Sequence, residues 1–176
     1  PQILLGDLRQ TDLGLTEADR RLLHEECAAV FHLAARYDLG MAENEARAAN
    51  VDGTARLLDL AAGCGMAARF HHMSSIAVSG DYDGLYGEGD FDQGQQALHP
   101  YGHSKFQAEG LVRGSGLPAS IYRAGVVVGD SQSGEMDKVD GPYYVFAILH
   151  RLRKLPGASR LPMIVPKYDD SLFHLV

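Results

Sequence analysis

The sequence has few of the features that mark secreted, membrane or nucleic-acid-binding proteins. Its 176 residues include two cysteines, Cys27 and Cys64, which have neither metal-ligand spacing nor a disulfide framework. No apolar run approaches the ~20 residues that a membrane-spanning helix needs, and no signal peptide opens the chain. The formal net charge is -7, with acidic and basic residues interspersed, which argues against nucleic acid or an anionic membrane as the main partner. We therefore expect a cytoplasmic protein with free thiols.

The composition and the order of patterns predict a single α/β domain. Apolar residues make up 45% and charged residues 22% of the chain, as in ordinary globular proteins. Buried strands are predicted at residues 2–7, 28–33, 69–74 and 119–128, and helices at residues 16–26, 42–62, 101–113 and 143–154. Strands that alternate with helices predict βαβ units in a doubly wound parallel sheet. In such sheets ligands bind beyond the carboxyl ends of the strands.

The segment from Tyr101 to Lys105 places a phenol and an ammonium one helical turn apart. A nearby cation favours the phenolate form of a tyrosine, so Lys105 could tune Tyr101 for proton transfer. Ser74 and Ser75, at the end of a predicted strand, offer hydroxyl donors for a substrate oxygen. The alternative is that this spacing arises by chance on an amphipathic helix.

Two adjacent histidines, His71 and His72, lie in the same predicted strand. Their side chains should point to opposite faces, because successive residues of a strand alternate. We therefore expect no metal site from this pair.

Six motifs in order resemble those of an extended short-chain dehydrogenase/reductase, in the NAD-dependent epimerase/dehydratase superfamily. They are Gly6-Asp7-Leu8, Phe31 to Ala35, Asn50 to Thr54, Ser74 to Gly80, Tyr101 to Lys105, and Ile121 to Gly129. The resemblance covers nearly the whole chain and implies a Rossmann-like fold. It also implies that the loop between the serine strand and the Tyr101 helix helps to line a substrate pocket.

The resemblance implies a role for each matching residue. Ser75, Tyr101 and Lys105 would be catalytic: Ser75 bonds the substrate carbonyl, Tyr101 moves the proton, and Lys105 also holds the nicotinamide ribose. Residues implied to contact the cofactor are Asp7, Leu8, Leu33, Ala34, Ala35, Ser74, Tyr101, Lys105 and Arg123. Of these, Asp7 would accept a hydrogen bond from the adenine, and Arg123 would approach the cofactor or pair with an acid at the sheet edge. Asn50 and Thr54 are expected to be structural supports.

A complete member of this superfamily begins with a strand and a Gly-x-x-Gly-x-x-Gly turn that binds the pyrophosphate. This sequence has no such motif, and Gln2 to Asp7 matches the third strand of the fold. We therefore expect an incomplete Rossmann-like domain over residues 1–176, without its first two strands and its C-terminal substrate-capping region. Such a fragment alone should be weak or inactive.

The segments Val128 to Ser131, Gly134 to Lys138 and Asp140 to Tyr144 resemble the branch of thioester reductases and fatty acyl-CoA reductases. This branch implies reduction of a small-molecule carbonyl or acyl thioester with NADP, although NAD is possible. A nucleotide-sugar epimerase or dehydratase and a non-catalytic NAD(P)-sensing protein remain the alternatives.

Overall fold

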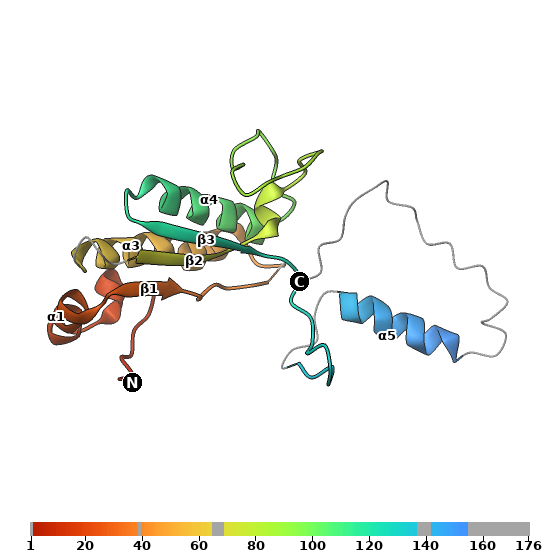
Figure 1. Cartoon of the computed structure of the whole chain (residues 1–176), viewed down its shortest axis with the longest axis horizontal. Coiled ribbons are helices and arrows are strands. Elements are labelled where there is room, and N and C mark those ends of the chain that lie inside the picture. The colour runs from red at the N-terminus through yellow and green to blue at the C-terminus, as the bar shows by residue number, and fades with distance from the viewer. Residues whose placement is uncertain (1, 39, 65–68, 137–141, 155–176) are drawn as a thin grey trace. The chain divides into compact units, whose positions relative to one another are not determined.

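The computed structural model describes residues 2–38, 40–64, 69–136 and 142–154 (Figure 1). The chain divides into two compact units, residues 1–124 and 125–176, which we describe separately. The prediction of one partial domain over residues 1–176 stays a prediction. The elements of the first unit are η1 (Thr11–Gly14), α1 (Glu17–Glu26), β1 (Ala29–His32), α2 (Glu43–Ala46), η2 (Arg47–Asp52), α3 (Gly53–Gly63), β2 (Arg69–Ser75), η3 (Ile76–Ser79), α4 (Pro100–Gly114) and β3 (Ala119–Ala124).

The centre of the first unit is a parallel sheet in the order β1-β2-β3. Residues 29–32 pair with residues 69–72, and residues 70–75 pair with residues 119–124. Each strand is followed by a helix that returns the chain to the next parallel strand, as expected for βαβ units. The predicted Rossmann-like class is confirmed.

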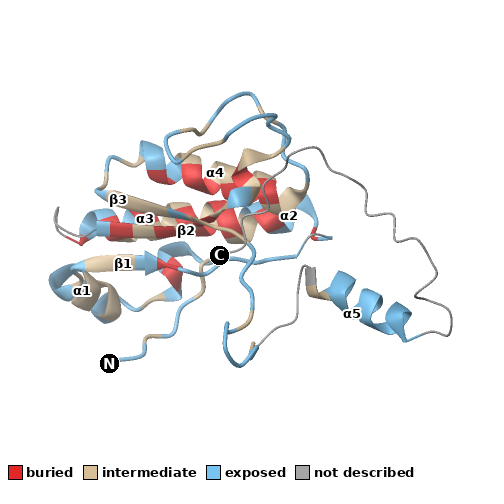
Figure 2. Ribbon diagram, turned by 45° about the vertical axis from the view of Figure 1, so that its right-hand side comes forward, coloured by how far each residue is buried: buried red, intermediate tan, exposed pale blue. Residues whose placement is uncertain are grey.

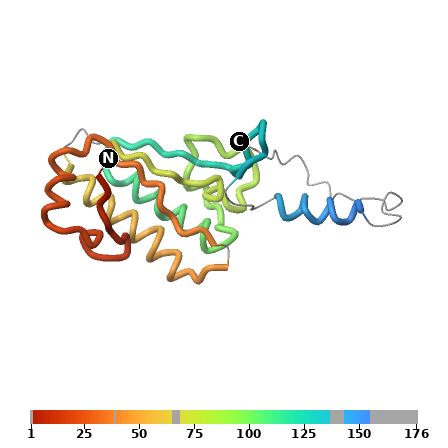
Figure 3. Tube along the Cα trace, turned by 90° about the horizontal axis from the view of Figure 1, so that it is seen from below, coloured from red at the N-terminus to blue at the C-terminus, as the bar shows by residue number. Residues whose placement is uncertain are grey.

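Helices α3 and α4 lie together on one side of this sheet (Figure 3). The buried residues gather where these helices face the strands (Figure 2). The core cluster consists of Leu58 and Ala61 from α3, Phe70 from β2, and Val112 from α4. Full burial of a side chain such as Phe70 contributes about 1.5–3 kcal/mol. This packing holds α4 against the middle strand, where the predicted site residues lie.

The two histidines of β2 point to opposite faces, as predicted. His72 is buried on the helix-covered face, whereas His71 lies on the other face between two aromatic rings. The His71 ring stacks on Phe31 at a centroid distance of 4.2 Å and on Tyr122 at 5.9 Å.

Two predicted strands differ from the structure for lack of a neighbour to pair with. Residues 2–7 have no regular strand structure, because they pair with none of the three strands. The strand predicted over residues 119–128 ends at Ala124, which pairs with Ser75, the last residue of β2. A strand is stabilised by cross-strand partners, so an apolar run alone does not make one.

The helix predicted over residues 42–62 is interrupted by a π-helical turn, η2. Single π turns of this kind are frequent at functional sites. The turn contains Asn50, whose contacts are described below.

The second unit contains α5 (Pro142–Arg153), which matches the helix predicted over residues 143–154. Within this unit the backbone amide of Gly129 donates to the Tyr143 hydroxyl at 2.8 Å. Part of the segment that resembles the thioester reductase branch, residues 137–141, lies outside the described residues. Across the described part of the chain, no helix has the length and apolar character needed to cross a membrane.

Candidate active site

Strand β2 and helix α4 bring Ser75, Tyr101 and Lys105 to the carboxyl end of the sheet. Ser75 is the last residue of β2, and Tyr101 lies in the first turn of α4. The helix begins at Pro100, a residue suited to the first helical position. His99 caps this end, because its Nδ1 accepts from the amide of Gly102 at 2.9 Å.

The hydroxyl of Ser75 serves both its own turn and Tyr101. Ser75 Oγ accepts from the amide of Ala77 at 3.2 Å, which starts the η3 turn. Burial raises the pKa of Tyr101, a hydrogen bond with the Ser75 side chain lowers it, and the nearby Tyr37 raises it further. The net pKa is raised, opposite to the direction suggested by the Tyr–Lys spacing, because burial outweighs the hydrogen bond. Tyr101 is therefore a phenol at neutral pH and suited to donate a proton.

The ammonium of Lys105 is nearly buried, with only 3% of the residue exposed. Its Nζ donates to the carbonyl oxygen of Met73 at 2.6 Å. Burial lowers the pKa of Lys105 to about 8, against an opposing effect of Glu109 one turn further along α4. A buried lysine is costly, and a perturbed lysine next to a tyrosine is typical of a functional site.

Asn50 connects the helix before α3 to the start of α4. Its Oδ1 accepts from the amide of Arg36 at 2.7 Å, and its Nδ2 donates to the Arg36 carbonyl at 3.1 Å and to Ser104 Oγ at 2.9 Å. Ser104 in turn donates to the carbonyl of Tyr101 at 2.8 Å. Thr54 Oγ1 donates to the Asn50 carbonyl at 2.6 Å. Asn50 and Thr54 are thus the structural supports that the sequence predicted.

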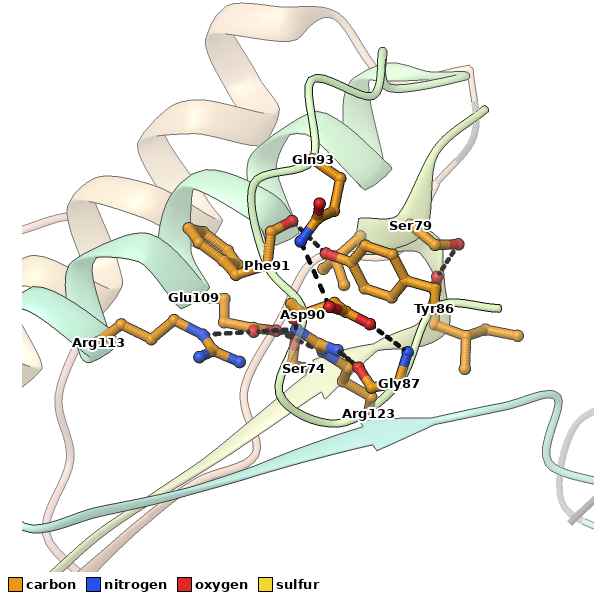
Figure 4. A network of polar contacts seen from close by, with 12 residues as sticks. Ser74, Ser79, Tyr86, Gly87, Asp90, Phe91, Gln93, Glu109, Arg113 and Arg123 are labelled. Carbon is orange, nitrogen blue, oxygen red and sulfur yellow. Dashed lines mark hydrogen bonds and ion pairs between the residues drawn. The ribbon is translucent and has the colours of Figure 1, made fainter. Parts of the chain in front are cut away.

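The two serines of β2 face different partners. The side chain of Ser74 is buried and donates to Glu109 Oε2 at 2.6 Å, whereas Ser75 reaches Tyr101. Arg123, on β3, also binds Glu109, with Nη2 2.7 Å from Oε1 and Nε 3.2 Å from Oε2 (Figure 4). Of the two alternatives for Arg123, the pairing with an acid is observed, and a cofactor contact stays a prediction, as it does for Ser74.

The remaining predicted cofactor residues lie on loops of the first unit. Asp7 binds Arg9, with Oδ2 2.8 Å from Nη2, and these hydrogen bonds lower the pKa of Asp7 to about 2. The carbonyl of Leu8 accepts from Arg56 Nη1 at 2.9 Å. Leu33, Ala34 and Ala35 are exposed directly after β1, at the carboxyl end of the sheet. Their cofactor contacts stay predictions.

Glu109 is the member of this cluster that sequence reasoning missed. It follows Lys105 by four residues, so helical periodicity alone places it on the face of Tyr101 and Lys105. That spacing was the available signal. Its 0% exposure and its arginine partners depend on the packing of α4 against the sheet.

The donors on α4 fit the ribose end of a nicotinamide cofactor. An ammonium has three protons, and that of Lys105 makes one hydrogen bond to the described residues, with Met73. Two protons therefore remain for the hydroxyls of a ribose, beside the Tyr101 phenol.

Residues 1–166 match the sequence profile of an NAD-binding family described as male sterility protein. The chain belongs to this family. It is 33% identical, over 73% of its length, to the aldehyde reductase lnbA of Aspergillus flavus, of which it covers 14%. The fold is similar to a crystal structure described as the terminal R domain from the myxalamid PKS-NRPS biosynthetic pathway. That match has 33% identity and a TM-score of 0.66, and covers 78% of this chain and 36% of the R domain.

A second structural relative is MoeE5, solved in complex with UDP-glucuronic acid and NAD. It is 30% identical, with a TM-score of 0.57, over 76% of this chain and 44% of MoeE5. The chain spans only 3% and 18% of two further curated relatives, both peptide synthetases. Together these relatives identify an extended short-chain dehydrogenase/reductase fold and a nicotinamide cofactor.

Proposed function

We propose that this chain carries the proton-transfer half of an NAD(P)H-dependent reductase acting on a carbonyl or acyl thioester. The observation that carries the proposal is Lys105. Its ammonium is buried one turn after Tyr101, at a substantial cost in solvation, and has protons to spare after its bond to Met73. A buried lysine of this kind is easier to explain by a ligand than by stability.

The proposed roles follow from these positions. Ser75 donates a hydrogen bond to the substrate carbonyl oxygen, and Tyr101 gives that oxygen its proton as the carbonyl carbon is reduced. Lys105 binds the ribose hydroxyls and keeps the phenol oriented. The cofactor, when bound, supplies the hydride. An aldehyde would thus become an alcohol, and an acyl thioester would yield an aldehyde and a free thiol.

The substrate class is supported by the relatives. An aldehyde reductase and a terminal R domain share about a third of their aligned residues with this chain. We propose NADPH as the reductant, with NADH as the alternative. No residue described here selects between them.

The assay uses a protein that contains this chain with any residues that precede Pro1 in its gene. It follows the loss of reduced-nicotinamide absorbance with an acyl-CoA or an aldehyde, and compares NADPH with NADH. Replacing Tyr101 by Phe should lower kcat about 10²–10⁴-fold, because a positioned acid is removed. The matched control is Tyr122→Phe, which alters a tyrosine on the other face of the sheet, bonded to His71. Unchanged turnover in Tyr101→Phe would contradict the proposed role.

A nucleotide-sugar epimerase is the second candidate, because MoeE5 has a similar fold and was solved with UDP-glucuronic acid and NAD. The same protein should then convert a UDP-sugar to its epimer with NAD and without net change in nicotinamide absorbance. Epimer formation together with no reduction of acyl-CoA or aldehyde would favour this candidate over the reductase.

A further inference from the structure

The segment that connects Ser75 to Tyr101 contains a closed loop, residues 80–96, which we call the connecting loop. The amide of Asp81 donates to the Gln96 carbonyl at 3.0 Å, and the amide of Gln96 donates to Asp81 Oδ1 at 2.6 Å. These two bonds close the neck of the loop, as in an Ω-loop. Because Ser75 precedes the neck and Tyr101 follows it, the position of this loop affects the spacing of the two hydroxyls.

One side chain, Arg123, attaches the body of the connecting loop to the sheet (Figure 4). Its Nη1 donates to the carbonyl of Gly87 at 3.0 Å, and its Nη2 donates to the carbonyl of Asp90. The guanidinium also lies over the ring of Tyr86, 4.9 Å from the centroid. A planar guanidinium can make all these contacts at once, whereas a lysine cannot.

The same guanidinium binds Glu109, which anchors it. The carboxylate is fully buried and accepts from Arg123, from Arg113 Nε at 2.9 Å, and from Ser74 Oγ at 2.6 Å. Burial raises the pKa of Glu109, but the hydrogen bonds from these residues outweigh it, so the pKa is lowered. The charge of Glu109 therefore persists at neutral pH, and a buried charge needs its partners kept in place.

The contacts of Glu109 extend to both sides of the candidate site. Ser74 adjoins Ser75 on β2, and Lys105 is one turn before Glu109 on α4. A single buried ion pair thus joins the strand of Ser75, the helix of Tyr101 and Lys105, and the loop between them.

We propose that Glu109 and Arg123 form a positioning pair that holds the connecting loop against the sheet and so sets the Ser75–Tyr101 geometry. The inference rests on the proposed function for its catalytic consequence, but not for its effect on the loop. Neither residue reacts with substrate. Small displacements of reacting groups are costly in enzymes, so a firmly held loop would favour turnover.

The first test measures the loop itself, in the protein used for the activity assay. Arg123→Lys keeps the charge but loses the fork, and should raise hydrogen exchange of residues 80–96 about tenfold or more, while the core of α3 stays protected. The matched control is Arg69→Lys, an arginine that also bridges β2 and β3, through the carbonyl of Ala119 and Ser120 Oγ, but does not contact the loop. Equal exchange of the loop in the parent and in Arg123→Lys would overturn the proposal.

The second test is kinetic and separates positioning from general instability. Arg123→Lys should lower kcat about tenfold or more for the proposed carbonyl substrate, while the Kd for NADPH stays within about twofold. Equal losses in kcat and in NADPH binding would overturn the positioning role. If Tyr101→Phe leaves activity unchanged, the proposed function fails, but the exchange result still decides whether the pair holds the loop.

A double variant guards against misfolding of the single ones. Glu109→Gln with Arg123→Met removes both charges, so no unpaired buried charge remains with this pair. The double variant should fold and still show raised exchange in residues 80–96. A folded double variant whose loop exchanges as slowly as the parent would overturn the proposal as well.

Discussion

Acidification should destabilise the fold through two histidines buried between the sheet and its helices. His32 is 3% exposed and His72 is 0% exposed, with ring centroids 5.4 Å apart. Burial, with a smaller effect of the Lys105 charge, lowers the pKa of His32 from 6.5 to about 4. Burial likewise lowers the pKa of His72 to about 3, with Lys105 and His32 adding to the shift and Glu109 opposing it.

The direction follows from the protons bound by each state. Below about pH 6.5 the unfolded chain protonates both imidazoles, whereas the folded chain keeps them neutral until the pH approaches 4 for His32 and 3 for His72. The free energy of unfolding therefore falls with pH across this window and is fully restored above it.

The magnitude can be worked from the same shifts. At about pH 5 the solution is about 1.5 units below the unfolded pKa, so each histidine costs about 2 kcal/mol at 1.36 kcal/mol per unit. Both together cost about 4 kcal/mol, against a total stability of about 5–15 kcal/mol for a typical domain.

The assay is urea unfolding, followed by circular dichroism, at several values between about pH 7.5 and pH 5. His72→Phe should remove about half of the pH dependence. It should cost little at neutral pH, since neither ring nitrogen of His72 bonds to a described residue. The control is His71→Phe, the same substitution one residue earlier, on the other face of the sheet. An unchanged pH dependence in His72→Phe would refute the reasoning.

Two further predictions concern the candidate site and the connecting loop. Lys105→Met should lower kcat about 10²-fold or more while changing the free energy of unfolding little, because a methionine fills the same space without a buried charge; a parent-like kcat would contradict the role of Lys105. Gly80→Ala should destabilise the protein by about 1–3 kcal/mol, because Gly80 has φ of +54° and an added Cβ would lie 2.2 Å from the Gln96 carbonyl oxygen. Its control is Gly114→Ala at the end of α4, where an added Cβ meets nothing within 4 Å, and equal unfolding midpoints for the two variants would show that the neck tolerates a side chain.

Local patterns were sufficient for much of the fold. The Thr16 helix start, for example, is realised as a capping box, in which Thr16 and Asp19 bond each other's backbone amides. The predicted helix over residues 101–113 also differs from α4 by a single residue at each end. Residues 2–7 failed because an apolar run records only the wish to be buried, and the pairing that makes a strand is not local.

By itself, the sequence determined the order of strands and helices and the one-turn spacing of Tyr101 and Lys105, since both depend on contacts within a few residues. It also showed that Ser74 and Ser75 point in opposite directions, because strand residues alternate. Only the tertiary structure decided that Ser74 turns to Glu109, that Arg123 joins this carboxylate to the connecting loop, and that Lys105 is buried. Those outcomes depend on how α4 packs against the sheet, and burial by residues distant in the chain sets both the pairing and the pKa values.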